Sequence, residues 1–343
     1  MESEIRKIRL AIHSVSFAFH RRYKEGFDFH ALIEAAANLG VSGVHISLND
    51  ANYRWIGGTS SERLREVGEA LRARGMFVEV DTSGTDEEHL IKLLDAARML
   101  GADRLRTYVT LQGSPEEKAR TTVRGLRRAA PIAADLGIQL LLENHEEFSG
   151  REIVHIMEEV DHPTVGALYD FGNSMMILED PMVAAKAMAP FIRTVHLKDQ
   201  ILTKDPSLAD RGAAENTIVC GVPIGRGNID VEGILRFLLN NTDLNRVCIQ
   251  SVYGYRAPIS RNLPQLAEAE RRYPVFAQET DLSDKSFCIL DPEALSRTDP
   301  CRLLNYEMSA VALGVGKVRE ILANLDFHIE SGGSSMDYRR KTG

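Results

Sequence analysis

The sequence predicts an α/β protein built as a single (β/α)8 (TIM) barrel. Short apolar runs, typical of strands buried on both faces, alternate with amphipathic segments over most of the chain. Three of these runs end on side chains that bind metals well, namely Glu143, Asp170 and His196. The runs lie about one strand plus one helix apart, so their ends are expected to converge at the barrel mouth, where barrel enzymes carry their chemistry.

The count of apolar runs favours a closed barrel over an open, doubly wound sheet, which would also alternate strands and helices. Eight strands are predicted in order: Ile8–His13, Gly43–Leu48, Met76–Asp81, Arg104–Tyr108, Gln139–Glu143, Gly166–Asp170, Arg193–His196 and Val247–Gln250. Glycine follows an amphipathic run just before several of these strands, at positions 40, 75, 101 and 137. Glycine at that place is typical of a helix end.

Several helices between the strands have recognisable starts. Capping boxes of the form S/T-x-x-E begin at Thr59, Thr85, Ser114 and Ser149. Pro115 and Pro181 fit the first helical position, behind Ser114 and Asp180 as N-caps.

Two stretches depart from this alternation. Residues 199–229 are rich in Gly, Asp and Asn and are predicted to be a long loop over the mouth after strand seven. Residues 251–300 form an extension after strand eight with several prolines and short helical patches, and a final helix is predicted from about 302 to 324. We expect residues 1–330 to form one barrel domain and 331–343 a flexible C-terminal tail.

Composition limits the class of protein. The chain has 343 residues, of which 44% are hydrophobic and 26% charged, with a net charge of −8. The negative charge argues against a nucleic-acid partner. No apolar stretch of membrane-spanning length or signal-peptide core is visible. The four cysteines are scattered with no CxxC pair, which indicates reduced thiols, so we expect a cytoplasmic protein.

The strand-end residues form the candidate metal site. Two carboxylates and an imidazole are good ligands for a divalent cation, and Gln250 could complete the set through its amide oxygen. Each residue alone has a simpler interpretation: Glu143 as half of a salt bridge, Asp170 as a helix cap and His196 as a core histidine. Their order on three consecutive strand ends favours the metal.

Three further residues are candidates for catalysis. His145 lies two residues after Glu143, on the same side of an extended chain, and could transfer a proton. Lys198 could neutralise negative charge on a substrate oxygen, and Arg226 in Gly225-Arg226-Gly227-Asn228 could bind a carboxylate or sugar oxygen. Weaker pocket-lining candidates are His13, Asp81, Tyr108, Trp55 and Arg256. The alternatives are structural: loop hydrogen bonds, salt bridges and, for Trp55, a hydrophobic plug.

Four motifs resemble those of a known superfamily. They are Leu142-Glu143-Asn144-His145-Glu146, Asp170-Phe171-Gly172-Asn173, His196-Leu197-Lys198-Asp199 and Pro223-Ile224-Gly225-Arg226-Gly227-Asn228-Ile229-Asp230. In this order they resemble the xylose isomerase-like barrels, in particular the sugar isomerase/epimerase branch, over about residues 8–250. The resemblance implies one divalent metal ion, usually Mn²⁺ but sometimes Mg²⁺, Co²⁺ or Zn²⁺. It would be held by Glu143, Asp170, His196 and the residue at position 250.

Position 250 departs from the pattern of the resembling epimerases, which usually have a glutamate there as one of two acid/base groups. Gln250 cannot transfer a proton at neutral pH, so one of the two bases is missing. A reaction with proton transfer on one side and a metal-stabilised enolate remains possible. The Glu143-x-His145 pair also resembles two lyase groups, the large subunit of C-glycoside deglycosidases and the 3-oxo-isoapionate decarboxylases.

The sequence therefore predicts a metal-dependent lyase acting on a keto sugar or keto sugar acid, such as a 3-oxo-C-glycoside or a 3-oxo sugar acid. His145 would be the acid/base group, and Lys198 and Arg226 would stabilise negative charge. The nearest alternative is a ketose isomerase or 3-epimerase with another second base. An apurinic-site endonuclease, which would need three zinc ions, and a non-catalytic subunit are more distant alternatives. A carbohydrate is the expected ligand, and a homo-oligomer, or a hetero-oligomer with a small second subunit, is the expected assembly.

Overall fold

The structure is a computed structural model of the chain. It describes residues 6–109, 113–205, 207, 216–259, 265–272 and 282–330. The C-terminal tail predicted over 331–343 lies outside these residues. In the described part, no helix is both long and apolar enough to cross a membrane.

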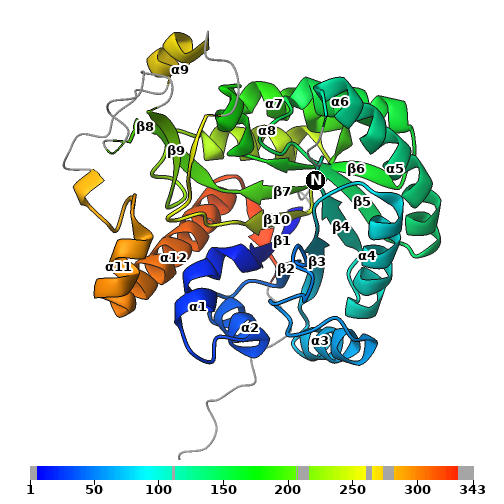
Figure 1. Cartoon of the computed structure of the whole chain (residues 1–343), viewed down its shortest axis with the longest axis horizontal. Helices are drawn as coiled ribbons and strands as arrows, with labels where there is room; N and C mark the ends of the chain where they lie inside the picture. Colours follow the sequence, from blue (N-terminus) through cyan, green and yellow to red (C-terminus); the bar gives the residue numbers. More distant parts are fainter. Residues whose placement is uncertain are drawn as a thin grey trace, which may run out of the picture.

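Eight parallel strands form a closed barrel at the centre of the molecule (Figure 1). They are β1 (Arg6–His13), β2 (Gly43–Ser47), β3 (Phe77–Asp81), β4 (Arg104–Thr107), β5 (Gln139–Glu143), β6 (Val165–Asp170), β7 (Ile192–Leu197) and β10 (Arg246–Ile249). Each strand pairs with the next, and pairing of β10 with β1 closes the barrel. The eight strands predicted from the sequence are therefore confirmed, with ends shifted by a residue or two.

Most of the helices surround the barrel, while α9 stands apart from it (Figure 1). They are α1 (Ala18–Tyr23), α2 (Phe29–Asn38), α3 (Ser61–Ala73), α4 (Glu87–Leu100), α5 (Pro115–Asp135), α6 (Gly150–Val160), α7 (Pro181–Met188), α8 (Val231–Asn241), α9 (Leu266–Arg272), α11 (Pro292–Thr298) and α12 (Pro300–Asn324). Short 3-10 turns cover Ser14–Phe17, Asn173–Ile177 and Ala189–Phe191. The predicted final helix corresponds to α12. Behind it, β12 (Phe327–Ile329) pairs with the start of β1.

The segment predicted as a long loop over residues 199–229 contains two strands, so that prediction is corrected. β8 (Asp199–Lys204) and β9 (Thr217–Val222) pair antiparallel, and β11 (Arg256–Pro258) adds to the other edge of β9. This small sheet stands beside the barrel (Figure 1). Buried apolar residues on β8 and β9 pack against Phe287 and Cys288, which explains why the hairpin forms outside the main core.

Helix ends follow the sequence signals in most cases. The capping boxes of Ser114 and Ser149 are formed. Those predicted at Thr59 and Thr85 are not, because Ser60 and Asp86, one residue later, accept the capping hydrogen bonds. The glycines at 40, 75, 101 and 137 all have positive φ of 63–79°, the left-handed region that glycine enters at no steric cost. Their prediction as helix ends is confirmed.

The barrel interior is polar, although barrels of this type are usually filled by aliphatic side chains. Glu79 on β3 accepts from Arg104 (3.1 Å) and Arg246 (3.2 Å) near the amino ends of the strands. Above this layer lie histidines and carboxylates. The apolar core lies instead between the strands and the helices, with Leu10, Ile46 and Val80 among its fully buried members. Charged and polar side chains therefore fill the barrel from the amino ends of the strands to the mouth at their carboxyl ends.

Candidate metal centre

Three side chains at neighbouring strand ends meet inside the barrel mouth. Glu143 ends β5, Asp170 ends β6, and His196 on β7 is the strand partner of Asp170. His196 Nδ1 lies 3.1 Å from Glu143 Oε1 and 3.7 Å from Asp170 Oδ2. The three ligand atoms lie within 4.8 Å of one another, and all three residues are buried. The structure thus brings together three of the four ligands that the sequence predicts.

The electrostatic environment keeps both carboxylates ionised. Burial acts to raise the pKa of Glu143, but the Arg106 guanidinium 3.5 Å away, together with His145 and His196, holds that pKa well below its usual range. Burial opposes ionisation of Asp170 as well, yet the Lys198 ammonium lowers its pKa. Two carboxylates that stay charged in a buried site are suited to hold a cation.

Gln250 supplies the test of whether the site fits a metal ion. It follows β10, its backbone N–H donates to Leu197 O at 2.8 Å, and only 8% of the residue is exposed. Its Oε1 is buried and has no hydrogen-bond partner among the described residues. A buried amide oxygen without a partner costs free energy unless something else binds it. Two carboxylates and one imidazole lie together, and a free amide oxygen follows the neighbouring strand, so the residue types present fit a divalent cation.

His145 and Lys198 stand beside these ligands. His145 Nδ1 lies 3.1 Å from Glu143 Oε2, and its ring stacks on Tyr108 with the centroids 3.8 Å apart. The side chain of His145 is 30% exposed, so it reaches the open end of the site. Lys198 is buried, with Nζ 3.1 Å from Asp170 Oδ2 and donating to Asn173 Oδ1 at 2.7 Å.

Gly172 makes room for that lysine. A Cβ at position 172 would come within 2.9 Å of Lys198 Cε and 2.4 Å of Gln200 Oε1. A larger residue there would push against the ends of the Gln200 and Lys198 side chains. The glycine in the Asp170-Phe171-Gly172-Asn173 motif thus has a direct packing role in the candidate site.

Arg226 is not brought to the metal ligands by its described contacts. Its side chain is 47% exposed, 4.0 Å from Asp284 Oδ2, and its guanidinium lies over Phe287. Its turn is fixed from below by Asp199, which accepts backbone hydrogen bonds from Gly225, Gly227 and Ile229.

The two weaker loop candidates also have structural contacts. Arg256 pairs with Asp205 at 3.1 Å, within the small sheet outside the barrel. Trp55 is partly buried against the main apolar core, as expected of a hydrophobic plug.

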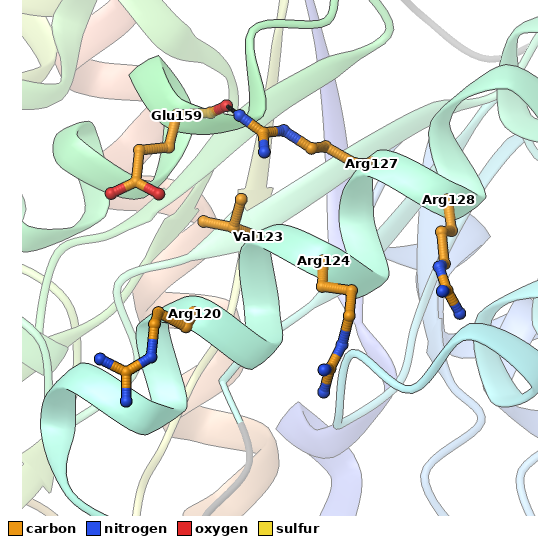
Figure 2. Close-up of a pocket in the computed structure, with 6 residues that line it drawn as sticks. All are labelled: Arg120, Val123, Arg124, Arg127, Arg128 and Glu159. Atoms are coloured by element: carbon orange, nitrogen blue, oxygen red, sulfur yellow. Dashed lines mark hydrogen bonds between the residues drawn. The ribbon is translucent and has the colours of Figure 1, made fainter.

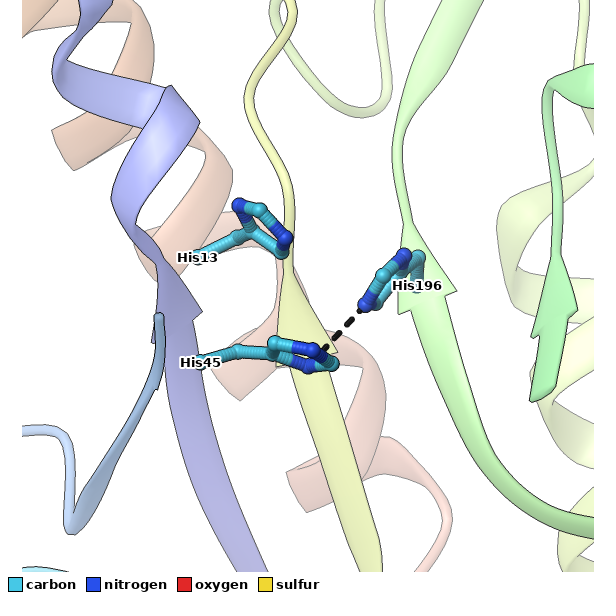
Figure 3. A group of neighbouring side chains, drawn as sticks. All are labelled: His13, His45 and His196. Atoms are coloured by element: carbon cyan, nitrogen blue, oxygen red, sulfur yellow. Dashed lines mark hydrogen bonds between the residues drawn. The ribbon is translucent and has the colours of Figure 1, made fainter. Parts of the chain in front are cut away.

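His196 also belongs to a second polar cluster. His13, His45 and His196 come from β1, β2 and β7 and point toward one another (Figure 3). His196 Nε2 lies 3.1 Å from His45 Nδ1, and His13 Nε2 lies 2.7 Å from Asp81 Oδ2. Burial holds the pKa of His45 well below its ordinary value, so its ring is neutral.

A surface pocket of about 410 Å³ lies on the outside of the barrel along α5 (Figure 2). It is lined by Arg120, Val123, Arg124, Arg127, Arg128 and Glu159, and Arg127 donates to the backbone carbonyl of Glu159. None of these residues belongs to the predicted site. We therefore place the candidate function at the barrel mouth.

Sequence reasoning missed two residues of the site, Arg106 and His45. Arg106 is 5% exposed and lies between Asp81 and Glu143, whose carboxylates it neutralises. A signal was present for both, because each is a charged or polar residue in the middle of a strand predicted to be buried on both faces. Such a residue has to point into the barrel and find a partner there.

The chain is similar to known proteins in sequence and in fold. The chain is 26% identical to the 3-oxo-isoapionate decarboxylase of Pectobacterium atrosepticum over 170 residues, 49% of this chain and 60% of the relative. The chain spans about 60% of the length of the curated relatives it matches first.

Solved structures share the fold. A D-allulose 3-epimerase from Methylomonas sp. superposes with a TM-score of 0.57 at 15% identity, covering 94% of this chain and 100% of that one. The protein IOLI, solved with a bound zinc atom, gives 0.56 at 15% identity, with 90% and 99% covered. Such low identities establish the fold alone. The model of the xylose isomerase-like TIM barrel family, however, matches residues 33–272, well over half of the chain. This chain is a member of the xylose isomerase-like TIM barrel family.

Proposed function

We propose that this chain is a divalent-metal-dependent lyase acting on a keto sugar or keto sugar acid. The observation that carries the proposal is the pairing of an intact ligand group, Glu143, Asp170 and His196, with a free amide oxygen at Gln250. Gln250 can bind a cation but cannot exchange a proton. The curated decarboxylase relative, 26% identical over about half of this chain, supports a lyase over an epimerase.

The four residues would hold the ion, with Mn²⁺ as the first candidate and Mg²⁺, Co²⁺ or Zn²⁺ as alternatives. A cation bound there supplies Lewis-acid stabilisation of negative charge on a substrate oxygen. Arg106 keeps Glu143 ionised for this purpose, and Lys198 does the same for Asp170. The IOLI structure, which contains zinc, supports metal binding in this fold.

His145 is the residue that moves the proton. Donation from its Nδ1 to Glu143 Oε2 leaves Nε2 as the free base, and the partly exposed ring faces the open end of the site. Lys198 Nζ, fixed by Asp170 and Asn173, places a positive charge where a substrate oxygen would become negative. Because Gln250 is not a base, acid/base chemistry is confined to the side of His145.

The test is incubation of the Mn²⁺-loaded protein with 3-oxo sugars and 3-oxo sugar acids in D₂O. Bond cleavage or CO₂ release is the expected result, and it should disappear after chelation and return with added metal. Deuterium exchange at a sugar carbon without cleavage would instead show an isomerase or 3-epimerase. Full activity of the metal-stripped protein would refute the proposal in either form.

A further inference from the structure

His196 packs against three other buried polar residues, His13, His45 and Asp81, which have no role in the reaction outlined above. The four residues come from β1, β2, β3 and β7, and at most 1% of each is exposed. Buried polar side chains in such a number require a set of mutually satisfied hydrogen bonds. These hydrogen bonds link His196 to His45, and His13 to Asp81.

His196 faces two different environments. Its Nδ1 points at Glu143 Oε1 and Asp170 Oδ2, and its Nε2 lies 3.1 Å from His45 Nδ1. A neutral imidazole that binds a cation through Nδ1 carries its proton on Nε2. That proton then needs an acceptor, and His45 Nδ1 is in place to accept it. Such a partner fixes both the tautomer and the ring orientation of a ligating histidine.

His45 must then carry its own proton on Nε2. This atom is buried without a hydrogen-bond partner of normal length among the described residues, and it faces Asp81 Oδ2 at 3.5 Å. Asp81 is itself held in place, because its Oδ1 accepts from Ser47 Oγ at 2.9 Å and from Asn49 Nδ2 at 3.1 Å. Asp81 therefore offers an acceptor for a proton on His45 Nε2. Glu79 Oε2 lies 3.6 Å from His45 Nδ1, farther than His196 Nε2 at 3.1 Å, so His196 is the nearer partner of Nδ1.

The hydrogen bonds of His13 argue against a second cation among the three histidines. The backbone N–H of Val15 donates to His13 Nδ1 at 3.1 Å, so the ring proton lies on Nε2, where it donates to Asp81 Oδ2 at 2.7 Å. Neither nitrogen of His13 then has a lone pair for a metal. The three histidines have the spacing of a metal site. Figure 3 marks the hydrogen bond between His45 and His196, and the bonds of His13 to Val15 and Asp81 leave it no free nitrogen for a cation.

We infer that His45 is a positioning residue: it accepts the Nε2 proton of His196 and thereby holds His196 with Nδ1 directed at the cation. This inference rests on the metal site proposed above. His45 touches neither the cation nor the substrate, and it acts through His196. Outer partners of this kind change metal affinity by about 10–100-fold when they are removed.

The test uses Mn²⁺ alone, titrated into metal-stripped full-length protein by calorimetry, with its dissociation constant and stoichiometry as readouts. H45L removes the acceptor and is expected to weaken Mn²⁺ binding about 10–100-fold. H45Q offers an amide oxygen as acceptor and is expected to restore affinity to within about threefold of wild type. H155L is the matched control, because His155 lies on α6 with 80% of its side chain exposed.

Equal weakening in H45L and H45Q would overturn the inference, since loss of packing would then explain both. Affinity of wild-type strength in H45L would overturn it as well. Two equivalents of Mn²⁺ per wild-type chain would replace it with a metal site built on the three histidines. If H45L does not fold, H45F keeps a ring against His13 and is expected to show the same loss. No Mn²⁺ binding by the wild type would refute the proposed function itself.

Discussion

Replacing Gln250 by leucine should change two measurable quantities in opposite directions. In the metal-free protein the buried Oε1 of Gln250 has no hydrogen-bond partner in the described structure, a condition that costs about 1–3 kcal/mol. Leucine has a similar volume and no polar atom. Q250L should therefore raise the free energy of unfolding of the metal-free protein by about 1 kcal/mol, or a Tm increase of about 1–3 °C.

The same substitution removes a proposed metal ligand. Mn²⁺ affinity should fall by at least about tenfold, since even outer partners of a metal site contribute that much. Unfolding in EDTA and Mn²⁺ calorimetry measure the two effects separately. Q139L is the control, because Gln139 lies at the opposite end of β5 from Glu143, and it should leave the Mn²⁺ affinity unchanged.

Q250E should have the opposite effect on both the stability of the metal-free protein and its Mn²⁺ affinity. A third carboxylate beside Glu143 and Asp170 should strengthen Mn²⁺ binding and destabilise the metal-free protein, because like charges repel in a buried site. A Q250L protein that is less stable without metal, yet binds Mn²⁺ as the wild type does, would refute the reasoning. Gln250 would then be a structural residue whose oxygen has no function in metal binding.

Further predictions concern the acid/base residue, the metal and an ion pair at the amino ends of the strands. H145A should lower kcat by about 10²–10⁴-fold at saturating Mn²⁺, and a kcat unchanged in H145A would exclude His145 as the base. Chelation should lower the Tm of the wild type, because a ligand at 100 times its Kd stabilises the folded state by about 2.7 kcal/mol; an identical Tm with and without Mn²⁺ would contradict a bound ion. Burial acts to raise the pKa of Asp103, but its hydrogen bonds with Arg246 lower this pKa below the usual range. The pair therefore stabilises the fold above about pH 4, and this contribution is lost as the pH falls. D103N should therefore destabilise the protein by at most about 1 kcal/mol at pH 7, and the difference from wild type should shrink as the pH falls below about 4. A difference that grows in acid, measured in denaturant titrations, would show the sign to be wrong.

The barrel strands and three ligands could be predicted because local signals determine them. An apolar run that ends on Glu143, Asp170 or His196 predicts a buried strand. It also predicts that the last side chain lies at the end of that strand, at the barrel mouth. The glycines that end helices are also a local signal, because the preference for positive φ is a property of the residue at that position. Capping was less certain, since Thr59 and Ser60, or Thr85 and Asp86, are adjacent candidates. The choice between them depends on the register of the helix against the barrel.

Other features depend on contacts between distant segments and could not be derived in this way. The hairpin of β8 and β9 is stabilised by Phe287 and Cys288, more than sixty residues later in the chain. The direction in which Arg226 points follows from its contacts with Asp284 and Phe287. Arg106 and His45 could be recognised as polar residues in apolar strands. Their partners could not, because these lie on other strands that come together only in the folded barrel.

The pairing of β9 with β11 has a consequence for engineering. β9 belongs to the insertion after the seventh barrel strand, and β11 begins six residues after Gln250, in the insertion after the eighth. The backbone ladder between them makes the two insertions one cooperative unit. A graft that exchanged only one of them with a homologue would leave an unpaired strand edge next to position 250. New substrate preferences in this scaffold will therefore require both insertions to be transplanted together.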